Sequence, residues 1–294
     1  MAELLILSRA VHFGSCLVLL ALFVVRRILE PAEPGEPAQP GETGARVNPC
    51  AAGACLAVAA GSGFLWFWVS VAGMNGSGLM DTLNMDLLKL VVTQTPPGEV
   101  WAFRAGVAVV LAVMLCLRPI RVWGIVPAAV FVGSIAWLGH AGAGDDTRRP
   151  WMLAADVAHL LAASLWPAGL LPFALLLKQK IKAGALEEAD LAARRFSAMS
   201  LVTVALLAAT GSVNAVFLVG SFHGLVAFPY GQLLIVKLVF FAAAVALGSR
   251  NLLVHKPRRE LVAMARKVWI ETALGALAVT VVAIMGTLPP SARP

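Results

Sequence analysis

The sequence has few charged residues and leaves little chain over for a soluble domain. Only 13% of its 294 residues are charged, whereas 60% are hydrophobic and the mean hydropathy is +0.84. These values exclude an ordinary soluble globule, in which about a quarter of the residues are charged. We therefore expect an all-α integral membrane protein.

The sequence also lacks the motifs of several other protein classes. Its four cysteines show neither CxxC spacing nor the density of a secreted disulfide scaffold. Because there is no GxxxxGK[ST] motif and no DKTG-type segment, we expect no nucleotide partner and no ATP-driven pump. The first apolar run has no basic n-region and no cleavage site, so we expect it to stay as a membrane span. Nothing points to an enzyme.

What is present is a series of apolar runs separated by charge, proline or glycine. A helix needs roughly 20 apolar residues to cross about 30 Å of hydrocarbon. The runs predict eight spans, with boundaries good to a few residues. They cover residues 4–25, 50–73, 100–117, 122–139, 151–177, 198–219, 230–249 and 268–287.

Basic residues gather in every second gap between these spans. The gaps after spans one, three, five and seven hold 16 of the 23 Lys and Arg residues, which predicts that these loops are cytoplasmic and both termini periplasmic. Topology thus explains the net charge of +7, and we expect the lipid bilayer, not nucleic acid, as partner. The first of these loops, residues 30–48, is rich in Pro, Gly and Glu and is predicted to be a disordered linker. In the third, LEEADLAARR predicts either a short interfacial helix or a solvated loop.

The two halves of the chain align weakly with each other. Arg9-Ala-Val-His12 corresponds to Asp156-Val-Ala-His159, and a glycine stands six residues before both Arg104 and Lys237. A duplicated four-helix unit gives parallel repeats with a natural site between the halves. We expect repeats over residues 1–139 and 140–294.

Most of the histidines fall toward the periplasmic side. These are His12, His140, His159 and His223. Arg9 and His12, like Asp156 and His159, are three residues apart and share a helix face. Ionisable groups in a membrane usually serve a function, and Asp156 could orient His159 as a ligand. Alternatively, each pair is a buried hydrogen bond that pins helices together.

Soft ligands accompany these histidines. Met74, Met80 and Met85 lie in an external polar segment, and Met152 stands one turn before Asp156. Thioether and imidazole together select copper(I), although methionine also simply fills apolar gaps. On the cytoplasmic side, Cys50, Cys55 and Cys116 form either an exit site or small buried hydrophobes. We assign Arg9, Arg104 and Lys237 a shared structural role outside the metal shell.

Four segments resemble a known family. They are WLGHAGAG from Trp137, DVAHLLAASLW from Asp156, RFSAMSLVTVALLAATG from Arg195 and YGQLLIVKL from Tyr230. Together they resemble the CopD/PcoD family of copper resistance membrane proteins, most specifically over about residues 137–250. The resemblance implies an eight-span bacterial inner-membrane protein that moves copper, often beside CopC, a small periplasmic copper carrier. It implies His12, His140, Asp156 and His159 as ligands. Where the family usually shows W-x-G-G, this chain reads Trp166-Pro167-Ala168-Gly169, and Pro167 predicts a kink in span five where close glycine packing would be expected.

Three functions remain open from the sequence. The first is a copper carrier that captures the ion outside and passes it inward, from the methionines to the histidines. The second is a haem b electron-transfer protein with His12 and His159 as axial ligands. The third is a copper sensor or assembly scaffold that binds copper at the outer site without transporting it.

Overall fold

The computed structural model describes residues 1–30, 48–76, 78–117, 122–140, 142, 147–253 and 259–292, and all regular structure in these ranges is helical. The predicted linker at 30–48 therefore falls outside the described residues except at its two ends. The α-helices are α1 (Ala2–Leu29), α2 (Pro49–Asn75), α3 (Met85–Gln94), α4 (Pro96–Leu117), α5 (Ile125–Gly133), α6 (Arg149–Leu165), α7 (Leu170–Lys182), α8 (Leu186–Leu218), α9 (Phe222–Ala227), α10 (Pro229–Leu253) and α11 (Arg259–Met285). Three 3₁₀ segments join them: η1 (Met80–Thr82), η2 (Val122–Gly124) and η3 (Ser134–Leu138).

The described residues contain seven helices long and apolar enough to cross a membrane, not the eight expected. They are α1, α2, α4, α6 together with α7, α8, α10 and α11. The difference lies at residues 122–139, where α5 ends after nine residues and continues as η3. Residues 125–138 rise only about 24 Å at the usual helical spacings, less than the hydrocarbon thickness. The chain is an all-helical membrane protein whose fifth helix is short.

The predicted kink at Pro167 is confirmed. Proline lacks a backbone N–H and its ring clashes with the preceding turn, so α6 stops at Leu165 and α7 starts at Leu170. The ring of Pro167 lies against Gly275 of α11, where an added Cβ would be 3.2 Å from the proline Cβ. A glycine contact is therefore kept at this break, but it is supplied by a different helix.

The LEEADLAARR segment is neither a separate interfacial helix nor a loop. It forms the first turns of α8, a helix of 33 residues that continues into a membrane span. Glu187 and Glu188 lie in its first turn, where carboxylates interact favourably with the helix dipole. Strong helix propensity at the start of the segment explains the continuity.

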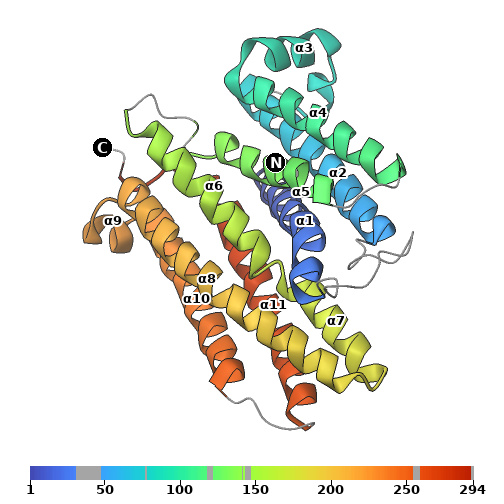
Figure 1. Cartoon of the computed structure of the whole chain (residues 1–294). Helices are drawn as coiled ribbons and strands as arrows, with labels where there is room; N and C mark the ends of the chain where they lie inside the picture. Colours follow the sequence, from blue (N-terminus) through green and yellow to red (C-terminus); the bar gives the residue numbers. More distant parts are fainter. Residues whose placement is uncertain are drawn as a thin grey trace.

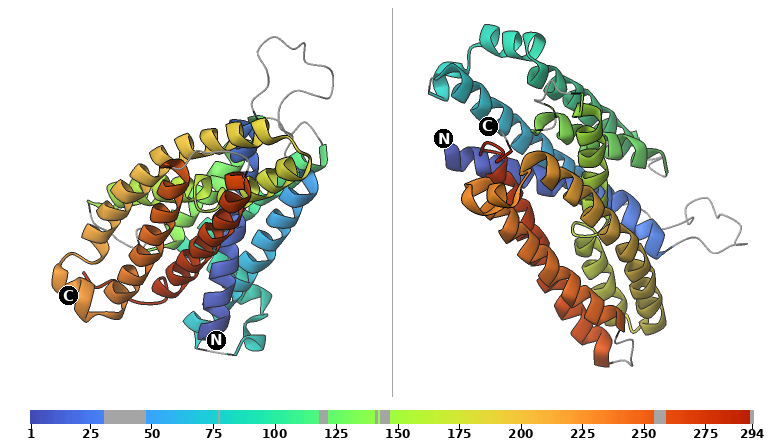
Figure 2. Two further views of the ribbon diagram at one scale, coloured as in Figure 1. Left: turned by 90° about the horizontal axis from the view of Figure 1, so that it is seen from below. Right: turned by 90° about the vertical axis from the view of Figure 1, so that its left-hand side faces the viewer.

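The first helix, α1, lies at the centre of the bundle (Figure 1), in contact with α2, α5, α6, α7, α8 and α11. Its side chains at Cys16, Leu19 and Phe23 are fully buried. Figure 2 shows the two chain termini toward the same end of the molecule. At that end, Gly286 after α11 touches Arg9 near the start of α1.

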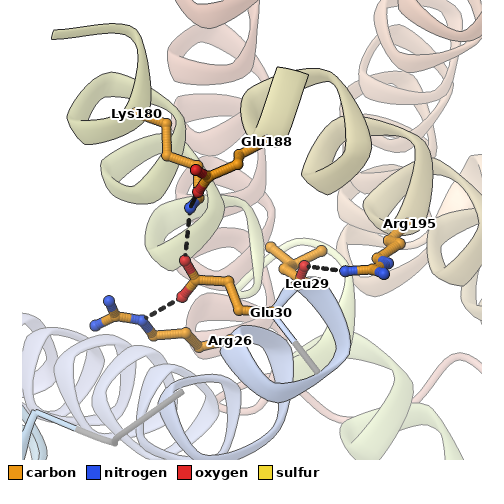
Figure 3. A network of polar contacts seen from close by, with 6 residues as sticks. All are labelled: Arg26, Leu29, Glu30, Lys180, Glu188 and Arg195. Carbon is orange, nitrogen blue, oxygen red and sulfur yellow. Dashed lines mark hydrogen bonds and ion pairs between the residues drawn. The ribbon is translucent and has the colours of Figure 1, made fainter. Parts of the chain in front are cut away.

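At the opposite end of α1, an ion-pair network joins three helices (Figure 3). The Glu30 carboxylate accepts from Arg26 Nε at 2.9 Å and from Lys180 Nζ of α7 at 2.8 Å. Lys180 also pairs with Glu188 of α8 at 2.5 Å. Partial burial alone would raise the pKa of Glu30, but the hydrogen bonds from Arg26 and Lys180 outweigh it and lower this pKa below its ordinary value.

A second contact at this end closes the last turn of α1. Arg195 of α8 donates to the carbonyl oxygen of Leu29 at 2.9 Å, as Figure 3 also shows. The final carbonyls of a helix have no partner within the helix, and a cation there also interacts favourably with the helix dipole. The C-terminal end of α1 is thus fixed to the hairpin of α7 and α8.

Candidate metal centre

His12 lies in a closed polar cluster on α1. Its side chain is 1% exposed, and its Nδ1 donates to the carbonyl oxygen of Ala59 in α2 at 2.8 Å. Because a carbonyl only accepts, the ring proton lies on Nδ1 and Nε2 carries the lone pair. That lone pair accepts from Nη2 of Arg104 in α4 at 2.6 Å. Both ring nitrogens of His12 are therefore satisfied.

Arg104 connects this cluster to the short helix α5. Its Nη1 donates to the Phe131 carbonyl at 2.7 Å and to Ser134 Oγ at 2.6 Å. The guanidinium also lies 4.5 Å from the centre of the Phe131 ring and 5.5 Å from that of Trp101. Its Nε is buried with no hydrogen-bond partner within the described residues. The structural role expected of Arg104 is therefore a fixed contact with His12 and α5.

Arg9 lies beside aromatic rings near the start of α1. Its guanidinium carbon is 4.6 Å from the Trp66 ring centre and 5.7 Å from that of Phe13. A Cβ added at Gly286 would overlap this guanidinium, so the end of α11 closes over it. Cation–π contacts of this kind stabilise a buried cation by about 1–2 kcal/mol.

His159, on α6, is held differently from His12. Its Nδ1 lies 2.9 Å from Thr210 Oγ1 in α8, and the Thr210 hydroxyl hydrogen is used by the Leu206 carbonyl at 2.7 Å. Thr210 must therefore accept from Nδ1–H, which leaves the Nε2 lone pair of His159 available. Thr210, not Asp156, thus fixes this tautomer, in contrast to the expectation from sequence.

Asp156 lies one turn before His159 among groups from α8 and α10. Its Oδ1 accepts from Asn214 Nδ2 at 2.6 Å. Lys237 of α10 interacts electrostatically with both Asp156 and His159. A carboxylate and an ammonium in apolar surroundings stabilise each other, since each alone would be costly to bury. We call Asp156, His159, Thr210, Asn214 and Lys237 the α6 cluster.

His140, between η3 and α6, adjoins the α6 cluster through Tyr230. The two ring centres are 5.7 Å apart in an edge-to-face arrangement, and Tyr230 interacts electrostatically with Asp156. The neighbouring Gly139 also faces Asp156, because an added Cβ would lie 3.9 Å from Oδ2. The structure therefore brings His140, Asp156 and His159 into one region. His12 is placed elsewhere, with its contacts coming from α2, α4 and α5.

The remaining predicted ligands lie at the periphery of the molecule. Met74, Met80 and Met85 are 64%, 77% and 75% exposed, at the end of α2, in η1 and at the start of α3. His223 of α9 is exposed with its ring edge-on to Phe228, and Met152 is half-buried on α6. These side chains are not gathered around one point with the buried histidines.

The cysteines named as an exit site are spread over two helices. Cys50 is exposed and Cys55 half-buried on α2, while Cys116 is exposed near the end of α4. Within the part of the chain that the structure describes, no three His, Cys, Asp or Glu side chains are grouped closely enough to hold a metal ion. A metal site with three or more of these side chains would require the helices or side chains to move from the arrangement in this structure.

Some residues around the α6 cluster did not emerge from the sequence. Thr210, Asn214 and Tyr230 were not predicted to be site residues. Thr210 and Asn214 are four residues apart in a membrane span and share a face, which was a usable signal. Glu271 of α11 was also missed, although its side chain is only 3% exposed within a membrane-spanning helix.

Comparison with known proteins identifies the relationship of the chain. A family model described as "Copper resistance protein D-like, N-terminal domain" matches residues 1–151, and one described as "Copper resistance protein D" matches residues 190–285. No solved structure matches the chain.

Three individual relatives match most of the chain. Copper resistance protein D of Pseudomonas syringae pv. tomato is 32% identical over 226 residues, which are 69% of this chain and 71% of the relative. Inner membrane protein YebZ of Escherichia coli K12 is 30% identical over 74% of this chain and 77% of its own length. Copper transport protein CutJ of Bacillus subtilis is 26% identical over 74% of this chain and 42% of its own length. The resemblance noted from the sequence is confirmed: this multi-pass membrane protein belongs to the copper resistance protein D family.

Proposed function

We propose that this protein carries copper(I) across the bacterial inner membrane into the cytoplasm, and that the α6 cluster is its main binding site. The observation that carries this proposal is the state of His159. Its Nδ1–H is held by Thr210, so that the Nε2 lone pair is set in direction and free to bind a metal. Metal-binding histidines are commonly fixed through their second nitrogen in this way.

Met152, Asp156 and His159 form a track along α6. They are spaced by four and three residues, so all three lie on one side of the helix. Thioether and imidazole suit copper(I), which takes few and soft ligands. In our proposal Met152 receives the ion, His159 binds it, and His140 completes the shell by moving past Tyr230. Lys237, which interacts electrostatically with His159, moves away as the copper ion arrives.

Capture begins at the exposed methionines. Met74, Met80 and Met85 are exposed, as is His223, and all lie beside helix ends on the side of the termini. We propose that this side is periplasmic, because the opposite end holds the basic residues. A periplasmic copper carrier of the CopC kind is the expected donor of the ion.

We further propose that the chain is built from two parallel repeats, residues 1–139 and 140–294. His12 forms a hydrogen bond with Arg104 of α4, and His159 interacts electrostatically with Lys237 of α10. The alignment of the two halves pairs His12 with His159 and Arg104 with Lys237, so these contacts support the proposed repeats. Gly98 and Gly231 also share a role, since an added Cβ would lie 2.0 Å from the Val91 carbonyl and 2.3 Å from the Gly224 carbonyl. Each glycine lets a short helix fold back tightly on a membrane span.

The test is copper uptake into proteoliposomes that contain the purified full chain. His159→Ala should abolish uptake and lower the bound copper(I), because the ligand with the prepared lone pair is lost. His223→Ala, at an exposed histidine of the proposed capture step outside the α6 cluster, should by comparison reduce uptake several-fold at most. Full uptake by His159→Ala would refute the assignment of the site.

The alternative functions are separated by the same preparation. A scaffold or sensor would bind copper at His159 yet show no uptake. A haem b protein would show a Soret band and stoichiometric iron, with His12 and His159 as ligands. We expect copper without a Soret band.

A further inference from the structure

Cys16 and His12 together offer a second pair of soft ligand atoms. Both residues lie on α1, which contributes no residue to the α6 cluster. Cys16 follows His12 by one helical turn and is fully buried. Its Sγ lies 3.6 Å from His12 Nε2 and 3.6 Å from Nη2 of Arg104. A thiol sulfur and an imidazole lone pair thus face the same small space, which the Arg104 guanidinium occupies in this structure.

We propose that His12 Nε2 and Cys16 Sγ form a two-coordinate copper(I) site in the first half of the chain. This goes beyond the proposed transport function, which is assigned to the α6 cluster. Bonds of about 2.0 Å to nitrogen and 2.3 Å to sulfur, as zinc shows, place two ligand atoms about 3.5 Å apart when bent and 4.3 Å apart when linear. The observed 3.6 Å matches the bent arrangement, so the two atoms must separate by about 0.7 Å to reach the linear arrangement that two-coordinate copper(I) prefers.

The surroundings of His12 fit a metal ligand. The bond from Nδ1–H to the Ala59 carbonyl directs the lone pair of Nε2 toward Cys16. The rings of Trp66 and Trp101 lie 5.6 and 5.5 Å from the imidazole and exclude water. A dry apolar wall favours the reduced ion, because copper(II) prefers additional hard ligands and water.

The charges also balance when copper binds. Copper(I) takes the place of the thiol proton of Cys16, which leaves to water, so the net charge of the cluster does not change. Within the described residues the Arg104 guanidinium forms no salt bridge, and a copper-bound thiolate would give it a negative partner. Arg104 gives up its bond to Nε2 but keeps those to Phe131 and Ser134.

The ligand count selects the metal. No third His, Cys, Asp or Glu side chain joins the pair within the described part of the chain. Zinc requires four ligands and calcium six or more, whereas thiolate with imidazole suits copper(I) at low coordination. The site is therefore specific for copper(I) by its small number of ligands.

The experiment uses the full chain with Cys50, Cys55 and Cys116 replaced by serine, so that Cys16 is the one remaining thiol. Copper(I) is added anaerobically, and the near-ultraviolet charge-transfer absorption of a copper–thiolate bond is recorded together with bound copper. We expect this absorption in the triple variant and its loss, with one copper equivalent, when Cys16→Ser is added. Methionine thioethers do not produce this band.

Two further variants separate this site from the transport site. His159→Ala in the triple background should keep the copper–thiolate band while copper is lost from the α6 cluster. The two proposals can therefore fail independently of each other. His12→Gln should remove the band even if Cys16→Ser does not fold. Absence of the band from the folded triple variant, or its persistence without Cys16, would overturn the proposal.

Discussion

At the scale of single residues, the two histidines that align between the proposed repeats differ in their hydrogen-bond partners. His12 has partners on both ring nitrogens, one of them the Arg104 guanidinium. His159 has the Thr210 hydroxyl on one ring nitrogen, and Lys237 interacts with it electrostatically. The difference between a planar five-donor guanidinium and a compact ammonium therefore separates a closed site from an open one.

Thr210→Val tests the tautomer of His159. Valine has nearly the shape of threonine but cannot accept the Nδ1 proton, so the direction of the Nε2 lone pair is no longer fixed. Copper(I) affinity should fall about 10- to 100-fold, as is usual when such a supporting partner is lost. Competition with a chelator of known affinity measures it.

Ser212→Ala is the control for that substitution. Ser212 is exposed and bonds only to the Ala208 carbonyl of its own helix. Its copper affinity should equal that of the unmodified protein. Equal affinity of Thr210→Val and Ser212→Ala would contradict the role given to Thr210.

Gly63→Ala tests the space beside His12. An added Cβ would lie 2.8 Å from His12 Cε1 and 3.0 Å from Trp101, both held by buried contacts. Overpacking of this kind costs about 1–3 kcal/mol, so the melting temperature in detergent should fall by several degrees. Gly61→Ala, with nothing within 4 Å of its added Cβ, should melt as the original does or slightly higher. Identical melting of the two variants would be inconsistent with this packing.

At the scale of helices, the ends of α1 carry opposite kinds of contact. Its first turns hold the buried cation of Arg9 among aromatic rings, whereas its last turn is fixed by the partly exposed ion pairs of Figure 3. The stabilisation from the buried cation–π contacts depends little on salt and pH, whereas the stabilisation from the ion pairs depends on both.

Glu30→Gln tests the ion pairs at neutral and acidic pH. The pKa of Glu30 is lowered in the folded protein, so its contribution to stability is present above the ordinary glutamate pKa of about 4.3. It is lost as the pH falls through the lowered pKa. The contribution is at most about 1 kcal/mol because the pairs are partly exposed.

The melting temperature should therefore be lower for Glu30→Gln than for the original at pH 7, and the two should converge as the pH falls through the lowered pKa of Glu30. Glu187→Gln is the control, because this exposed carboxylate in the first turn of α8 shows no ion pair within the described residues and loses only its interaction with the helix dipole. A constant difference between Glu30→Gln and the original at every pH would show that the charge of Glu30 is irrelevant.

Helix positions were more predictable than helix partners. Long apolar runs located the spans, and Pro167 located the break, because hydrophobic length and a missing N–H act locally. The length of the helix at residues 122–139 was overestimated, because composition alone does not reveal where an α-helix tightens into a 3₁₀ helix. The contact between Cys16 and Arg104 depends on residues 88 apart, and no local pattern encodes it.

At the scale of the whole molecule, the orientation in the membrane is the main prediction. Glu3 and Lys182 are exposed near opposite ends of the bundle. In a background with Cys50 and Cys116 replaced by serine, a membrane-impermeant maleimide should label Glu3→Cys in spheroplasts. It should label Lys182→Cys only after the membrane is opened. The reverse pattern would place the termini in the cytoplasm and redirect the proposed transport.

The central place of α1 has a consequence for biosynthesis. As the first helix of this chain, α1 leaves the ribosome before any helix that it contacts. Arg104, the hydrogen-bond partner of His12 Nε2, is made 92 residues after His12, and Arg195, which closes the last turn of α1, is made 166 residues after Leu29. Since buried polar groups are costly in lipid, α1 must be held by the insertion machinery or at the lipid headgroups until those helices arrive. The polar contacts of α1 therefore form only after later helices have been inserted, and the bundle does not assemble by packing one complete helical hairpin after another.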